Sequence, residues 1–425
     1  MSKRQKLSGE MSVSSGLAAE ARINEILEAA SKHDDSKLER LLKEYKFKDV
    51  DAMDVQNAQG TTPLHAAITS SAKEVNSDGE SASDESAGCD TVRLLLESGA
   101  IWNQMDENNE TPGCVAFRLG LLDLYELMVD AGVRAEILLN RLEGYERLDE
   151  ENEENEVDDK ADDGNADLAA EAHVNGAPTN EDEAPELIDA TVATINDMTV
   201  QAQSDVNSAN YLSSNLVLTR DKLLDGEQNG VMMAWESDIM KRSVDFLLHR
   251  PGMKVLNIGA GMMIFDTFVQ DHANKPEIHH IVEAHSDVLT NMENQGWDKK
   301  PSVTIHPGRW QDILPQLVAE NQAFDAIYYD TFAESYSEFR EFFTEYVLGL
   351  LEADGRWSFF NGMGADRQIS YDVYQKVVEM DLFEAGFDIE WHEMDIPELD
   401  AEWEGVKRKY WNVQKYRLPV CKFMD

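Results

Sequence analysis

The spacing of apolar residues differs between the two halves of the chain. After about residue 190, four short apolar runs are separated by stretches with a helical period. These runs are 254–258, 278–283, 324–329 and 355–360. Strands that alternate with helices are typical of a parallel sheet with helices on both faces. A later run, 410–420, alternates apolar and polar residues, which predicts an antiparallel edge strand. We therefore expect a doubly wound α/β domain over residues 191–425.

Before that point the apolar spacing is helical. Residues 23–30 and 37–45 form an amphipathic pair, and Gly60-Thr61-Thr62-Pro63-Leu64-His65-Ala66-Ala67 begins a further helix. A second version of this motif, Thr111-Pro112-Gly113-Cys114, has Gly-Cys where the first has Leu-His. Gly99 to Thr111 is 12 residues and Thr111 to Gly132 is 21, which add up to 33.

These motifs resemble ankyrin repeats, which have a period of about 33 residues and begin a helix with Thr-Pro-Leu-His. The resemblance implies an all-α repeat domain over residues 21–145, with a degenerate second unit. Thr62 to Gly99 is 37 residues rather than 21, and the acidic, Ser-rich stretch 73–90 accounts for the excess of 16. Ankyrin stacks have no chemistry of their own, so we expect this domain to bind a protein or to be a structural appendage.

The net charge of −46 comes from 83 acidic and 37 basic residues. So few basic residues disfavour nucleic acids and anionic membranes as direct ligands and are compatible with a cationic partner. Residues 149–189 hold 17 acids and one Lys, and 73–90 hold six acids and one Lys, so together they carry −21. The first of these stretches cannot bury enough apolar surface to fold. We expect a disordered linker over 146–190 and place a disordered tail at 1–20.

The run 254–258 ends in a glycine-rich turn. Gly259-Ala260-Gly261-Met262-Met263 precedes a helical stretch that begins at Ile264. A strand that leads into Gly-x-Gly and a helix lets a cofactor approach the backbone closely. No third glycine follows at the usual spacing, which disfavours a pyrophosphate. Glu283 ends the next strand, 24 residues after Gly259, where an acid binds ribose hydroxyls.

The other polar residues add one candidate site residue and argue against a metal site. Asp330 follows the run 324–329, at the sheet edge where ligands bind in open α/β folds. Histidines 279, 280 and 285 alternate faces, so we expect no metal site. The three cysteines are scattered without metal spacing, which indicates free thiols in a reducing compartment. They are Cys89, Cys114 and Cys421.

The element order resembles the seven-stranded S-adenosylmethionine-dependent methyltransferase fold. Five motifs in one order resemble guanidinoacetate methyltransferase over residues 205 to 425. They are 231–236 followed by Met240, 255–262, 281–284, 308–312 and 329–331. Together with the ankyrin repeats and the acidic linker, they resemble the fungal type IV protein arginine methyltransferases, which methylate the internal (δ) nitrogen of arginine.

This resemblance implies S-adenosylmethionine as the cofactor and assigns residues to its parts. The methionine moiety would be wrapped by Gly259, Ala260, Gly261, Met262, Met263 and Ile264. Glu283 would bind the ribose hydroxyls, with Ala284 and His285 alongside, and Trp310 and Gln311 would flank the adenine. Met232 would lie near the sulfonium, and Tyr211 stands where the family has an aromatic residue. Asp330 completes the set of cofactor residues.

The resemblance assigns the substrate to Glu236 and Asp330. A guanidinium is a planar cation with five donors in a fixed fork, so two carboxylates can clamp its terminal nitrogens and direct the third nitrogen at the methyl group. Methyl transfer is an in-line displacement, in which positioning supplies much of the rate. One acid can also accept the proton that the nitrogen loses, and we favour Asp330. Without this context, Glu236 would be taken for a surface acid and Trp310 for a core residue.

Enzymes that methylate terminal guanidino nitrogens carry a hairpin with two glutamates and a Thr-His-Trp loop. This chain has no Thr-His-Trp, and Glu236 has no partner glutamate at the expected spacing. We therefore expect monomethylation of the δ-nitrogen of arginine in a protein, and the resemblance implies a ribosomal protein. One alternative is a methyltransferase of a free guanidino metabolite, which would not need a protein-binding domain. The other is an ankyrin scaffold with a vestigial methyltransferase domain, although such a domain would lose its charged site residues first.

Nothing in the sequence indicates a membrane protein. The N-terminus lacks the apolar run of a signal peptide, and no window of 18 apolar residues occurs. We expect a soluble monomer. Lys3-Arg4-Gln5-Lys6 is a short basic patch that would aid nuclear import, so both cytoplasm and nucleus are expected.

Overall fold

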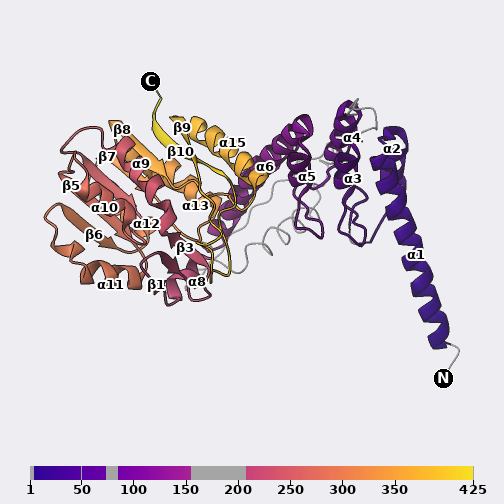
Figure 1. Cartoon of the computed structure of the whole chain (residues 1–425), viewed down its shortest axis with the longest axis horizontal. Coiled ribbons are helices and arrows are strands. Elements are labelled where there is room, and N and C mark those ends of the chain that lie inside the picture. Colours follow the sequence, from indigo (N-terminus) through magenta and orange to yellow (C-terminus); the bar gives the residue numbers. More distant parts are fainter. Residues whose placement is uncertain (1–3, 49, 73–84, 155–206, 425) are drawn as a thin grey trace, which may run out of the picture.

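The computed structural model describes residues 4–48, 50–72, 85–154 and 207–424. The N-terminal part forms a row of helices that projects from a larger α/β domain (Figure 1). We call α1 to α6 the helical block. Its helices are α1 (Arg4–Ser31), α2 (Asp35–Glu44), α3 (Pro63–Ser70), α4 (Glu85–Glu97), α5 (Pro112–Leu119) and α6 (Leu122–Glu154).

The two Thr-Pro motifs start helices in the same way. Thr62 caps α3 and Thr111 caps α5, each accepting a hydrogen bond from the third residue of its helix, with a proline at the first position. His65 closes the first cap on Thr62 and also reaches the carbonyl of Glu110, which joins the two units. This arrangement of stacked helix pairs is consistent with the predicted repeats, and the expected pair before them is present as α1 and α2.

The predicted boundaries of the N-terminal region differ from the helices. Helix α1 begins at Arg4, within the expected tail 1–20, and α4 begins at Glu85, within the expected acidic insertion 73–90. Helix α6 continues to Glu154, past the expected start of the linker. The parts of these stretches that are helical contain no proline, so no residue in them interrupts the helix. The rest of the predicted linker, 155–190, lies outside the described residues.

The second part forms an α/β domain that we call the catalytic domain. A small sheet consists of β1 (Val217–Leu218), β2 (Lys222–Leu224) and β3 (Gly230–Met233), and the main sheet consists of β4 (Lys254–Ile258), β5 (Ile278–Glu283), β6 (Val303–Pro307), β7 (Phe324–Tyr329), β8 (Leu351–Phe359), β9 (Phe387–Asp395) and β10 (Lys415–Phe423). Its helices are α8 (Ser208–Ser213), η1 (Ala234–Glu236), α9 (Ser237–Leu247), α10 (Ile264–Asp271), α11 (Ser286–Asn294), η2 (Trp297–Lys299), α12 (Trp310–Ala319), α13 (Tyr336–Glu341), η3 (Phe342–Val347), α14 (Leu348–Leu350) and α15 (Gln368–Glu384).

The main sheet has the order β6-β5-β4-β7-β8-β10-β9 and confirms the predicted seven-stranded fold. Neighbouring strand residues point to opposite faces, so Val255 packs with α9, α10 and α11, while Leu256 packs with α12 to α15. Strands β4 to β8 pair in parallel, and β10 runs antiparallel to both of its neighbours. These layers place the carboxyl ends of β4, β5 and β7 at one edge of the sheet.

The expected edge strand at 410–420 was wrong in two respects. Strand β10 begins at Lys415, and it lies inside the sheet between β8 and β9, which forms the edge. The residues before it form a loop in which Trp411 and Val413 are buried in an aromatic cluster. Their alternation therefore reflects burial under this loop rather than a strand.

No helix within the described ranges is long and apolar enough to span a membrane. The three cysteines are free thiols, with Cys89 and Cys421 buried and Cys114 half-buried.

Candidate active site

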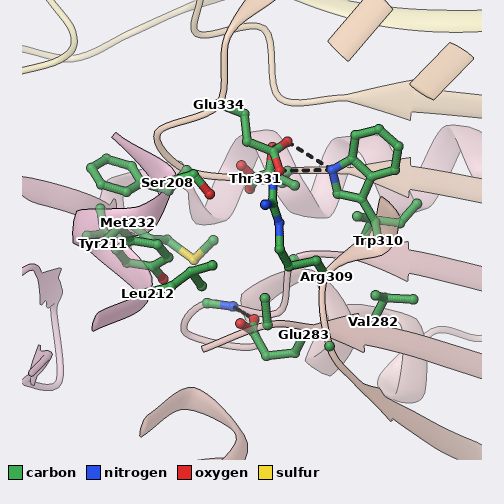
Figure 2. A pocket seen from close by; sticks show the side chains of 18 residues that line it. Ser208, Tyr211, Leu212, Met232, Val282, Glu283, Arg309, Trp310, Thr331 and Glu334 are labelled. Carbon is green, nitrogen blue, oxygen red and sulfur yellow. Dashed lines mark hydrogen bonds between the residues drawn. The ribbon is translucent and has the colours of Figure 1, made fainter. Parts of the chain in front are cut away.

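A pocket lies at the carboxyl ends of β4, β5 and β7 (Figure 2). Tyr211, Leu212 and Met232 form one side of it, and Trp310 lies on the opposite side. Glu283 lies at its lower edge in this view. Because three adjacent parallel strands end here, residues far apart in the sequence meet in one place.

Two glycines permit the close approach of chain segments at this pocket. A Cβ on Gly259 would lie 1.9 Å from the carbonyl oxygen of Asp330, and its φ of +89° is left-handed. A Cβ on Gly261 would lie 2.6 Å from the Cε of Met232, so the small sheet packs directly on the turn. Met263 has a φ of +58°, so the turn keeps a backbone conformation that glycine favours although the third glycine is absent.

The carboxylate of Glu283 is held by backbone amides. It accepts hydrogen bonds from the N–H groups of Ala260 at 2.9 Å and His285 at 2.7 Å, and Gly261 is within 3.4 Å. Burial raises the pKa of Glu283, and these amides oppose the rise because they favour the charged form. The carboxylate therefore has a fixed position at the end of β5.

Helix α8 closes one side of the pocket. The ring of Tyr211 contacts Phe332 and His285, and the Nε2 of His285 is 3.1 Å from the backbone carbonyls of Tyr211 and Ser214. His285 thus anchors the segment that carries Tyr211.

Trp310 and Glu334 form the opposite side. The indole N–H of Trp310 lies 2.9 Å from the carboxylate of Glu334, as the dashed lines in Figure 2 show. The hydroxyls of Thr331 and Tyr329 also donate to Glu334, the first at 2.7 Å. Three donors on one carboxylate fix the loop after β7 against the start of α12.

Two acids, the buried Glu236 and the half-buried Asp330, line a second, larger groove beside this pocket. Glu236 accepts hydrogen bonds from the Tyr410 hydroxyl and from the backbone N–H of Met233 at 3.0 Å. One carboxylate oxygen of Asp330 is buried without a hydrogen-bond partner. Such an oxygen is costly unless a donor reaches it.

The two acids disfavour each other's ionisation. Burial raises the pKa of Glu236 to about 8, although the Tyr410 hydroxyl and the Met233 amide oppose the rise. Burial also raises the pKa of Asp330, and the charge of Glu236 raises it further. Two like charges in a buried site cannot both form easily, so the pair is ready to accept a cation.

The groove is wider than one guanidino group requires. It holds about 760 Å³ and extends from the two acids along the loop after β7 to Tyr374 of α15. Basic side chains line it as well, including Arg309 and Lys409. A polypeptide that presents an arginine side chain would fit a groove of this extent better than a small metabolite alone.

The predicted cofactor residues divide into two sets. Those that line the pocket are Tyr211, Met232, Gly259, Gly261, Glu283, Ala284, Trp310 and Asp330. The others do not line it and lie in the adjoining turn, strand end and helix starts; they are Ala260, Met262, Met263, Ile264, His285 and Gln311. Trp310 is 3% exposed in the sheet core and also lines the pocket, so its position is compatible with both a core role and a role at the adenine.

Several residues at the site were not predicted, among them Tyr410, Glu334 and Arg309. Arg309 could have been predicted as a site residue, since it lies next to Trp310 in the motif 308–312. Tyr410 comes from a loop that joins β9 to β10, and no spacing in the sequence indicates that this loop reaches Glu236. Within the described residues, no group of His, Cys, Asp and Glu could hold a metal ion.

Comparison with known proteins shows which proteins this chain is similar to. A model of the guanidinoacetate N-methyltransferase family matches residues 207–421. A protein arginine N-methyltransferase 2 from Emericella nidulans is 55% identical over 94% of this chain and 96% of its own length. The protein of the same name from Aspergillus fumigatus is 54% identical over 96% of this chain and 98% of its own length. Among solved structures, the O-methyltransferase TomG from Streptomyces achromogenes in complex with SAM is 15% identical, with a TM-score of 0.32 over 44% of this chain and 80% of that chain.

Proposed function

Because the chain belongs to the protein arginine N-methyltransferase 2 family, we propose that it transfers a methyl group from S-adenosylmethionine to the δ-nitrogen of an arginine in a protein. The relatives match nearly the whole chain, so the family assignment includes the helical block as well as the catalytic domain. Their name supports protein arginine methylation. The choice of the δ-nitrogen and the identity of the substrate protein are part of our proposal.

The pocket has the features that S-adenosylmethionine requires. Glu283 is fixed where it can accept hydrogen bonds from ribose hydroxyls. Gly259 and Gly261 line the same pocket and let Asp330 and Met232 pack closely on the turn where the methionine moiety would lie. Trp310 offers a ring surface for the adenine, and Met232 lies beside Gly261. The cofactor supplies an electrophilic methyl group, and the protein supplies its position.

The pair of acids Glu236 and Asp330 is the observation that carries the proposal. An arginine guanidinium brings a positive charge and several N–H donors, and the unpartnered oxygen of Asp330 can accept one of them. Its charge offsets the burial that raises the pKa of both acids and the repulsion that raises the pKa of Asp330 further, so binding favours the ionised pair. An ionised Asp330 can then accept the proton that the nitrogen loses during methyl transfer.

Two features favour the internal nitrogen of a protein arginine. Glu236 has no partner glutamate in its turn, unlike the two-glutamate hairpin of enzymes that methylate terminal nitrogens. The groove extends well beyond the acids, which suits a polypeptide. The resemblance to type IV enzymes implies a ribosomal protein, and we propose a monomer that acts in the cytoplasm and the nucleus.

One experiment separates this proposal from its rivals. The protein would be incubated with methyl-labelled S-adenosylmethionine and a cell extract, and labelled polypeptides would be hydrolysed to identify the arginine derivative. We expect label in a protein. Label only in small molecules would favour a free guanidino metabolite as the substrate, and no label would favour a scaffold.

A further inference from the structure

Helix α15 belongs to the catalytic domain, but one face of it packs into the core of the helical block. In Figure 1 it lies beside α6, although more than 200 residues separate them in the sequence. Its residues Ile369, Val373 and Val377 are at most 1% exposed and belong to the hydrophobic core of the block. They are four residues apart, so they form one stripe on the helix. The other side of α15 contributes Val378 and Leu382 to the core of the main sheet.

The degenerate repeat provides the space for this helix. Gly113 stands where the first Thr-Pro motif has Leu64, and a Cβ on Gly113 would lie 1.8 Å from the Cδ1 of Ile369. A Cβ on Gly132 of α6 would likewise lie 2.6 Å from the Cγ2 of Val373. Ile369 therefore occupies volume that a side chain at position 113 would need. The loss of Leu-His from the second motif marks a docking site rather than a decayed repeat.

Polar contacts fix the orientation of the two parts. The Tyr125 hydroxyl donates to Asp372 at 2.5 Å, and the Tyr374 hydroxyl lies 3.1 Å from the carboxylate of Glu136. Lys376 forms an ion pair with Asp130 at 3.1 Å. Hydrogen bonds between partly buried groups depend on distance and angle, so they define one arrangement of α6 against α15.

The same contacts lead to the substrate groove. Tyr374, which is bonded to the block, lines the groove. Asp372 also accepts a hydrogen bond from Arg417 at 2.6 Å. The hydroxyl of the neighbouring Tyr371 is 3.1 Å from the amide of Asn361, which follows Phe360 of the groove wall. One helix thus connects the block to two parts of the wall.

We propose that the helical block is a structural part of the substrate site, because it holds α15 and thereby sets the wall of the groove that receives the arginine-bearing polypeptide. The part of this inference that concerns the substrate rests on the proposed function. The block then acts as a positioning element, and the expected protein-binding role of the repeats is exercised first on the enzyme's own catalytic domain.

Gly113→Leu tests this directly because it restores the residue of the first motif. In an independent stack the change would stabilise the protein, since leucine favours a helix more than glycine. If α15 docks here, the new side chain displaces Ile369. We then expect faster hydrogen exchange in α15 and in residues 360–366. Transfer to proteins of a cell extract should fall about 10- to 100-fold, as expected for a misplaced substrate, with S-adenosylmethionine affinity unchanged. Glu126→Leu, on the exposed face of α6, is the matched control and should change neither the hydrogen exchange nor the methyl transfer.

A second variant shows whether position 113 acts through Ile369. Gly113→Ala should accelerate exchange in α15, and Gly113→Ala combined with Ile369→Ala should restore part of the protection, because it removes the atoms that the new Cβ meets. The proposal is overturned if Gly113→Leu leaves α15 protected, or if α15 opens while exchange in 360–366 and transfer stay unchanged. If the wild type transfers no label to protein, the proposed function fails, and exchange in 360–366 still decides whether the block sets the groove wall.

Discussion

At the scale of residues, the site depends on keeping two acids out of water. Glu236 is 2% exposed, and its hydrogen bonds from Tyr410 and Met233 only partly offset the cost of its charge. The arrangement costs stability in the free protein and becomes favourable when a guanidinium arrives. Function at this site is therefore expected to oppose stability.

Glu236→Gln tests this opposition. The change should lower kcat about 100- to 1000-fold, because it removes a charge that stabilises the bound cation. It should also raise the free energy of unfolding near pH 8. The folded pKa of Glu236 is about 8 and the ordinary value is 4.5, so the folded wild type binds more protons than the unfolded chain and loses stability as the pH rises between these values. Thermal unfolding at several pH values would measure this gain in stability of the variant over the wild type, which should vanish below pH 4.5. A variant that is less stable than the wild type at pH 8 would contradict this account.

The activity should follow the ionisation of the same pair. Because burial raises the pKa of both acids, kcat/KM for the protein substrate should rise with pH up to about 8, where Glu236 ionises. A pH profile of initial rates, with cofactor affinity measured at each pH, would check it. A profile that is flat or falls over this range would mean that neither acid must lose a proton before the substrate binds.

At the scale of elements, the buried strands could be predicted from the sequence. The exposed strand β9 and the contacts between distant segments could not. The runs 254–258, 278–283 and 324–329 match β4, β5 and β7, because a strand covered on both faces must be apolar throughout. Strand β9 was missed because most of its residues are partly or fully exposed. The position of the glycine turn, of Glu283 and of Asp330 followed from these strands.

Contacts between distant loops could not be predicted in this way. Tyr410 reaches Glu236 across 174 positions of the sequence, and no local pattern encodes that distance. The docking of α15 was hidden for a similar reason. Gly113 has no side chain, so its residue type does not predict that another helix packs against it. From the sequence it could be interpreted only as the loss of the leucine of the first motif.

The turn after β4 gives a test at this scale. Gly259 and Gly386 have nearly the same φ, +89° and +88°, but only at Gly259 would a Cβ strike another segment. Gly386→Ala should cost about 1–2 kcal/mol of stability from backbone strain alone. Gly259→Ala should cost more, and it should weaken S-adenosylmethionine binding because it displaces the Asp330 backbone. Calorimetry and cofactor titration of both variants would measure this, and equal losses of stability with unchanged binding would contradict it.

At the scale of the whole molecule, the net charge of −46 is less informative than its distribution. The two acidic stretches carry −21, and most of their residues lie outside those that the structure describes. The cationic target is indicated instead by two carboxylates, one of which has an unpartnered oxygen. The helical block and the catalytic domain share a hydrophobic core through α15, so they form one unit of structure.

This shared core predicts how the protein unfolds. The two parts should unfold in a single thermal transition, because loss of either one exposes Ile369, Val373 and Val377. S-adenosylmethionine should raise the midpoint of the entire transition. Differential scanning calorimetry of the full chain, with and without the cofactor, would measure it. Two separate transitions, of which only one responds to the cofactor, would mean that the parts are energetically independent.

The most direct test of the central claim is the identity of the methylated nitrogen. Protein labelled by the enzyme would be hydrolysed to amino acids and compared by chromatography with standards of arginine methylated at the δ-nitrogen and at a terminal nitrogen. We predict that the label elutes with the δ-methylarginine standard, and that Asp330→Asn yields no labelled arginine although it still binds the cofactor. Label that elutes with the terminal-nitrogen standard would contradict the assignment of Glu236 and Asp330 to the terminal nitrogens of the guanidinium.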